Sequence, residues 1–137
     1  IIRYIRNEST VQRFAPEMET CNPDVGAWDT SSVTTLERAF FCASSFDRDI
    51  SAWNTSAVQN IDATFGYAGA FNHNLSAWDV SSVTSMLLTF EWATSFERGV
   101  SAWDTSSVTS MEGMLRHARV FNEDISGWDV SKVNTAS

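Results

Sequence analysis

A column of acidic and amide side chains recurs in this sequence at a spacing of 25 residues: Asp29, Asn54, Asp79, Asp104 and Asp129. Stacked carboxylates of this kind could hold calcium through oxygen ligands. Alternatively, each side chain could cap backbone N–H groups at the start of a helix, a role that Asp and Asn fill equally well. Because Asn54 interrupts the column without a compensating acid nearby, we favour capping, and we expect no metal site and no cofactor.

The other reactive residues form no catalytic pattern. His73 and His117 stand in different columns, and no Ser, Cys or carboxylate recurs with either to suggest a triad. Acid–base catalysis by two carboxylates needs two environments that separate their pKa values, whereas a repeated column gives every copy the same environment. The sequence also has no Gly-rich phosphate loop. We therefore expect that the protein is not an enzyme.

The two cysteines, Cys21 and Cys42, lack the His and Cys companions that a zinc site requires. A disulfide between Cys21 and Cys42 is one interpretation of the pair. Two buried thiols that pack as small hydrophobic residues are the other.

Composition restricts the class of protein further. The 137 residues carry 17 acidic and 9 basic side chains, for a net charge of −8. This charge argues against binding to nucleic acid, which depends on clustered Lys and Arg, and against docking on anionic lipid. No stretch approaches the roughly 18 to 20 apolar residues that a membrane helix needs. Six Trp and nine Phe, with six Gly and two Pro, indicate a folded chain.

A 25-residue repeat organises the apolar residues. Five tryptophans form its clearest column: Trp28, Trp53, Trp78, Trp103 and Trp128. From Val33, apolar residues follow at offsets of three, seven and ten, which predicts a short amphipathic helix. The segment around Asp49 to Ala52 is predicted to be a short strand. A single unit cannot bury its apolar face alone, so we expect the units to stack. We expect a cap at residues 1–20, complete repeats at 21–45, 46–70, 71–95 and 96–120, and a partial repeat at 121–137.

The repeat resembles the BspA-like leucine-rich-repeat surface-protein family. Residues 83–106, from Val-Thr-Ser-Met to Val-Ser-Ala-Trp-Asp-Thr-Ser, carry the resemblance most clearly, and it extends over about residues 21–137. It implies a non-enzymatic, secreted or surface-attached protein. The fold expected is an α/β repeat: a right-handed, leucine-rich-repeat-like solenoid with one short parallel strand and one short helix in each 25-residue coil.

The tryptophan column has two interpretations. Flat aromatic faces stack on sugar rings, which would make the column a carbohydrate-binding site. The alternative is that every Trp fills a corner of the core and donates its indole N–H to a backbone carbonyl. Because the column is regular in every copy, we favour the core.

Bulky apolar residues in columns that vary between repeats are the candidates for contact with a partner. They are Phe41, Tyr67, Leu87, Leu88 and Trp92. A varying column is expected to face solvent, and exposed apolar patches mark interaction sites. Ordinary packing within the chain is the alternative, and the sequence does not choose between the two.

The leading hypothesis is therefore a non-catalytic repeat module that binds another protein, as a surface or adhesin segment or as an accessory scaffold subunit of a larger complex. A glycan-binding module that uses aromatic side chains is the alternative from a different class. A purely structural spacer is a third interpretation, which the apolar residues in variable columns disfavour. The resemblance favours an extracellular or cell-surface location, and an organelle or complex-bound location is the alternative that the sequence leaves open.

Overall fold

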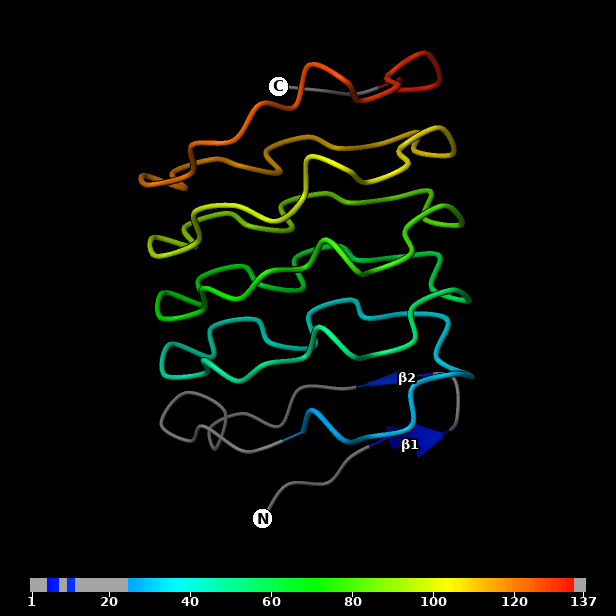
Figure 1. The fold of residues 1–137 in the computed structure, drawn as a ribbon, viewed down its shortest axis with the longest axis vertical. Coiled ribbons are helices and arrows are strands. Elements are labelled where there is room, and N and C mark those ends of the chain that lie inside the picture. The colour runs from blue at the N-terminus through cyan, green and yellow to red at the C-terminus, as the bar shows by residue number, and fades with distance from the viewer. Residues whose placement is uncertain (1–4, 8–9, 12–24, 135–137) are drawn as a thin grey trace.

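The structure, a computed structural model, describes residues 5–7, 10–11 and 25–134. Within these residues, successive 25-residue repeats wind into coils that stack along the longest axis of the molecule (Figure 1). Single parallel β-bridges join neighbouring coils at one position, linking Thr35 to Asn60, Asn60 to Ser85 and Ser85 to Ser110. Each coil therefore lies in register on the one before it.

Two short strands lie near the N-terminus. Strand β1 (Ile5–Asn7) pairs antiparallel with strand β2 (Thr10–Val11). Both strands fall within the segment 1–20 for which the sequence predicts a cap. The remainder of that segment lies outside the described residues.

The α/β fold expected from the sequence is wrong. Residues 25–134 contain no helix and no strand, so the chain does not form a leucine-rich-repeat-like solenoid with one strand and one helix per coil. Turns occupy the segments that carry the predicted helical stripe, which we call the turn segments: residues 36–43, 61–68, 86–93 and 111–118. No strand forms around Asp49 to Ala52, and the parallel bridges lie at Thr35 and its equivalents instead.

Hydrogen bonds between coils replace the helix. In an α-helix each N–H donates to a carbonyl four residues earlier in the same segment. Here the N–H groups of alternate residues point along the stack: Leu36 donates to Asn60, Arg38 to Asp62, Phe40 to Thr64 and Cys42 to Gly66, all at 2.8–2.9 Å. The equivalent bonds in the next two coils measure 2.7–3.0 Å. The N–H groups of these alternate residues are thus hydrogen-bonded to carbonyl groups of the neighbouring coil.

The backbone angles of the turn segments exclude a right-handed helix. Arg38 and Cys42 have φ of 55° and 58°. The N–H of Ala39 donates to Leu36 and that of Ala43 to Phe40, which makes Arg38 and Cys42 the third residues of two tight turns. Such type II turns need a positive φ at that position. Later coils place Ala63 and Tyr67, Leu88 and Trp92, and Gly113 and His117 there, also with positive φ.

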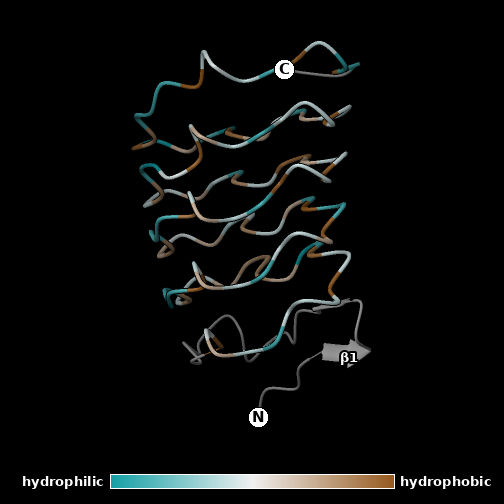
Figure 2. Ribbon diagram, turned by 45° about the vertical axis from the view of Figure 1, so that its right-hand side comes forward, coloured by the Kyte–Doolittle hydropathy of each residue, from teal (hydrophilic) through white to brown (hydrophobic). Residues whose placement is uncertain are grey.

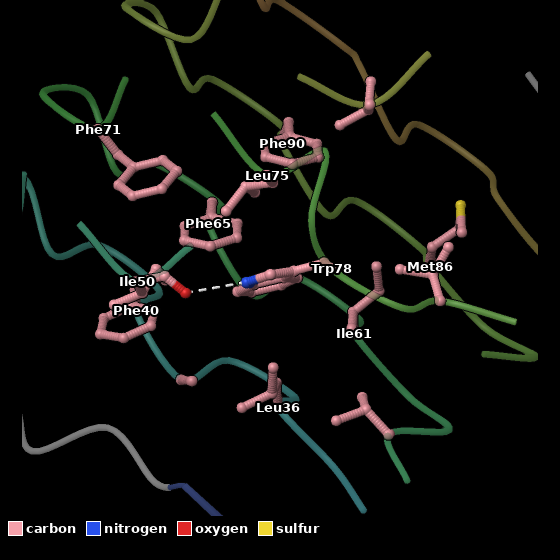
Figure 3. Packing of buried hydrophobic residues seen from close by; sticks show 14 of the residues in the cluster. Leu36, Phe40, Ile50, Ile61, Phe65, Phe71, Leu75, Trp78, Met86 and Phe90 are labelled. Carbon is pink, nitrogen blue, oxygen red and sulfur yellow. Dashed lines mark hydrogen bonds between the residues drawn. The ribbon is translucent and has the colours of Figure 1, made fainter. Parts of the chain in front are cut away.

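The core is a set of stacked side chains. Apolar residues point inward at every third or fourth position around the coil, because each turn returns the chain toward the axis after that many residues. One set buried to within 4% exposure is Val58, Ile61, Phe65, Ala68, Phe71, Leu75 and Trp78. In Figure 2 hydrophobic stretches of the ribbon recur in successive described coils. Equivalent rings stack on one another, with the Phe40, Phe65 and Phe90 centroids 5.6 and 5.3 Å apart (Figure 3).

The tryptophan column joins coils through its indole groups. The Nε1–H of Trp78 donates to the carbonyl of Ile50 in the preceding coil at 3.0 Å, as the dashed line in Figure 3 shows. Trp53, Trp103 and Trp128 make the equivalent bonds at the same length. Buried polar side chains are satisfied similarly, since the Oγ1–H of Thr64 lies 2.9 Å from the Leu36 carbonyl and 2.8 Å from that of Ile61.

Candidate interaction surface

Four aromatic residues of the variable columns form a continuous row on the outside of the turn segments. We call this row the aromatic strip: Phe41, Tyr67, Trp92 and His117. Phe41 meets Tyr67 edge to face at 5.7 Å between ring centroids, Tyr67 stacks on Trp92 at 6.2 Å, and Trp92 stacks on His117 at 4.1 Å. Tyr67, Trp92 and His117 lie at the positive-φ position of a turn. The N–H groups of Tyr67 and Trp92 each donate a hydrogen bond to the next coil, which fixes the turns that contain them.

Glycines in the following coil make room for two of the predicted partner-binding residues. A Cβ atom at Gly66 would lie 2.9 Å from Cδ2 of Phe41, so the Phe41 ring fills the space beside that glycine. A Cβ at Gly113 would lie 2.6 Å from Cδ2 of Leu88. Phe41 and Leu88 therefore pack against the chain itself and are only partly exposed.

Tyr67 and His117 are the exposed members of the strip, Tyr67 with 43% of its surface accessible, and Trp92 is partly exposed. Two guanidinium groups lie over rings of the strip. The Cζ atom of Arg38 is 5.1 Å from the centroid of Phe41, and that of Arg119 is 5.4 Å from the centroid of Trp92. Cation–π contacts of this kind contribute about 0.5–1 kcal/mol at exposed sites. The strip thus presents ring edges with basic groups beside them.

A cleft of about 220 Å³ lies beside the strip, and we call it the leucine cleft. Leu87, Leu88, Glu112 and Arg116 line it. Arg116 pairs with Glu91 of the preceding coil at 3.5 Å. The two leucines are among the residues predicted from the sequence to bind a partner. Glu112 and Arg116 are not, although they occupy the same variable columns as Leu87 and Glu91.

The tryptophan column lies in the core. Trp53, Trp78 and Trp103 are 3–4% exposed, Trp128 is 9% exposed, and Trp28 is partly buried. Neighbouring rings are nearly parallel at 6.4–6.5 Å between centroids for the pairs 28–53, 53–78 and 103–128. Each ring of these pairs covers a face of its neighbour.

The acidic column forms a series of local turns. Oδ1 of Asp104 accepts the N–H and the O–H of Ser106 at 3.1 and 2.6 Å, and Oδ1 of Asn54 accepts the same pair from Ser56. Hydrogen bonds from Ser lower the pKa values of the carboxyls in this column, and the bond from the hydroxyl has a larger effect than the bond from the amide. The carboxyls are those of Asp29, Asp79, Asp104 and Asp129. The side chains cap turns rather than the predicted helices. No group of three or more His, Cys, Asp or Glu in the described part of the chain could hold a metal ion.

Glu123 makes a contact that was not predicted from the sequence. Its Oε2 accepts the N–H groups of Gly99, Val100 and Ser101 at 2.9, 2.8 and 3.0 Å. Burial opposes ionisation of Glu123, but these hydrogen bonds outweigh it, so the pKa of the carboxyl is lowered. Gly99 stands where other repeats carry Asp49, Asn74 or Asp124. The carboxylate of Glu123 therefore replaces the local cap that Gly99 lacks.

The remaining predicted residues lie apart from the strip or outside the described chain. Cys42 carries a free thiol and is partly exposed, whereas Cys21 lies outside the described residues. His73 contacts Oδ1 of Asp47 at 3.1 Å beside a polar cleft on another part of the coil. Along the described residues no helix is long and apolar enough to span a membrane.

The stacked coils define this chain as a repeat protein. A family model described as "Mycoplasma protein of unknown function, DUF285" matches residues 9–100 and 77–137. These matches cover most of the sequence, so the chain belongs to this family. Comparisons with curated proteins and with solved structures found no match.

Proposed function

We propose that this chain is a non-catalytic module that binds another protein through the aromatic strip and the leucine cleft. The observation that carries the proposal is the continuous row of contacting rings from Phe41 to His117 in columns that vary between repeats. Aromatic residues and Arg are enriched at protein interfaces. The BspA-like resemblance of the repeat favours a surface or adhesin segment, and an accessory subunit of a larger complex would use the same strip.

The way the rings are packed favours a protein partner over a glycan. A sugar ring stacks on a free aromatic face, but Trp92 is stacked between Tyr67 and His117. The core tryptophans are stacked on one another and buried. The strip and the leucine cleft present ring edges, apolar side chains and guanidinium groups to a partner. These groups suit the side chains of a protein better than the face of a sugar.

Site-specific photocrosslinking tests the proposal. Benzoylphenylalanine replaces Tyr67 in one version of the protein and the exposed Ala102, which is outside the turn segments, in another. In the cell of origin, we expect Tyr67 to give a discrete protein adduct that Ala102 does not give, and a second substitution, Trp92→Ala, should weaken it. Equal adducts at both positions, adducts at neither, or saturable quenching of tryptophan fluorescence by a polysaccharide without a protein adduct would refute it.

A further inference from the structure

The leucine cleft has an apolar floor and one carboxylate, that of Glu112, in its lining. Leu87 occupies a column in which the other coils carry Glu37, Asp62 and Glu112. Oδ1 of Asp62, in the preceding coil, accepts the N–H of Leu87 at 2.8 Å and the O–H of Ser85 at 2.6 Å. Glu112, in the following coil, lines the cleft. A side chain lying on Leu87 would therefore meet the Glu112 carboxylate inside the cleft, while the Asp62 carboxylate is bonded to the backbone of Leu87.

The charges around the cleft leave an excess of negative charge. Arg116 is paired with Glu91 at 3.5 Å, and Arg119 lies over Trp92. The exposed carboxylate of Glu112 has no ion pair with any residue that the structure describes. Oδ1 of Asp62 accepts its hydrogen bonds from two neutral donors, the hydroxyl of Ser85 and the amide of Leu87. The chain as a whole has a net charge of −8, which favours the approach of cations.

We infer that the leucine cleft receives a basic side chain, Lys or Arg, from the partner protein; this inference rests on the proposed function. Such side chains combine an apolar stem with a cationic head. The stem packs on Leu87 and Leu88, and the head pairs with Glu112. A purely apolar side chain would bury the leucines equally well but would leave the Glu112 carboxylate without a counter-charge.

Two peptides that differ only in the charged head test this assignment. The blocked peptides acetyl-Gly-Lys-Gly-amide and acetyl-Gly-norleucine-Gly-amide are titrated separately into the full ¹⁵N-labelled chain, and amide shifts are followed by NMR. We expect the lysine peptide to shift the resonances of Leu87, Leu88 and Glu112 and to bind more tightly than the norleucine peptide. Glu112→Gln should weaken lysine binding about threefold, the order expected for one exposed ion pair. The matched control is Glu37→Gln, which alters the same column beside Arg38 and should leave binding unchanged.

Three outcomes overturn the inference. They are equal affinity for the two peptides, unchanged lysine binding in Glu112→Gln, and shifts spread over acidic residues elsewhere without a response at Leu87 and Leu88. Each of these would leave the proposed function standing if Tyr67 still crosslinks a protein. The absence of a crosslink at Tyr67 would remove the proposed function whatever the peptides do, so the two failures are distinguishable.

Discussion

The ring of Phe41 occupies the space that a side chain at Gly66 would need: a Cβ atom there would lie 2.9 Å from Cδ2 and 3.1 Å from Cε2 of that ring. The two residues belong to successive coils, and the N–H of Cys42 donates to the carbonyl of Gly66 at 2.8 Å, so the coils cannot separate to relieve the contact without losing this bond. A large side chain in one coil is thus matched by a glycine in the next coil.

Gly66→Ala should therefore destabilise the protein by about 1–3 kcal/mol, the usual cost of overpacking. Urea unfolding followed by tryptophan fluorescence measures the change. The matched control is Gly69→Ala, whose Cβ would meet only Oγ1 of Thr94 at 3.5 Å, an ordinary contact. In a Phe41→Ala background the Gly66→Ala substitution should cost less. An equal cost with and without the Phe41 ring would contradict the account.

Trp78→Phe tests the bonds that join the tryptophan column to the preceding coil. The substitution removes the 3.0 Å bond to Ile50, whose carbonyl also accepts the backbone N–H of Trp53. We expect a loss of about 1–3 kcal/mol from the missing hydrogen bond and the smaller ring. Trp92→Phe is the control, because Trp92 lies outside the buried column and is partly exposed. A larger loss in Trp92→Phe than in Trp78→Phe would be evidence against the column as a structural element.

Acid should weaken the stack through the acidic column. The hydrogen bonds from Ser106 lower the pKa of the Asp104 carboxyl below its ordinary value of 3.8. A carboxyl whose pKa is lower in the folded chain adds stability above its unfolded pKa, and this contribution is lost as the pH falls through the lowered value. Unfolding midpoints measured in urea should therefore fall as the pH drops below 3.8.

Asparagine variants isolate that contribution. Asp104→Asn should keep the cap at neutral pH, as Asn54 does with Ser56, and should lose less stability in acid than the unsubstituted protein. The reverse change, Asn54→Asp, should make the acid loss larger. If Asp104→Asn leaves the loss in acid unchanged, the hydrogen bonds from Ser106 are not its source.

Glu123→Gln should destabilise the coil that contains Gly99. The carboxylate accepts three N–H groups, and an amide oxygen accepts them less strongly because it carries no full charge. We expect a loss of about 1 kcal/mol, reduced from the value for buried charged bonds by solvent screening. Glu97→Gln, at an exposed position in the same coil as Gly99, should change stability by less. Equal effects of the two substitutions would show that the contact with Gly99 contributes nothing.

The sequence predicts the stacking and the inward residues but not the local backbone. Trp53 and Trp78 are neighbours across one coil boundary because a fixed 25-residue period puts equivalent residues side by side. The helix was a wrong prediction because inward turns return to the axis every three or four residues, which is also the period of a helix. The segment Phe46, Ile50 and Trp53 already shows this spacing, and a strand would need a period of two.

The candidate surface was predictable in part. Variation between repeats is visible in the sequence, and it picks out Tyr67 and Trp92. The partner of each variable residue is not visible, because contacts such as Leu88 with Gly113 depend on which columns of successive coils meet. The positive φ of Arg38 and Cys42 could not be predicted from the sequence. The third residue of a type II turn is usually Gly, and neither Arg nor Cys signals such a turn.

The binding of a protein to the aromatic strip is tested by measuring the affinity of the partner that crosslinks at Tyr67. The dissociation constant is measured for the unsubstituted chain, for Tyr67→Ala and for Val120→Ser, which removes an exposed apolar side chain outside the strip. We predict that Tyr67→Ala weakens binding roughly tenfold or more, as expected for a central aromatic contact, and that Val120→Ser leaves it unchanged. Unchanged affinity in Tyr67→Ala, or an equal loss in Val120→Ser, would contradict the account.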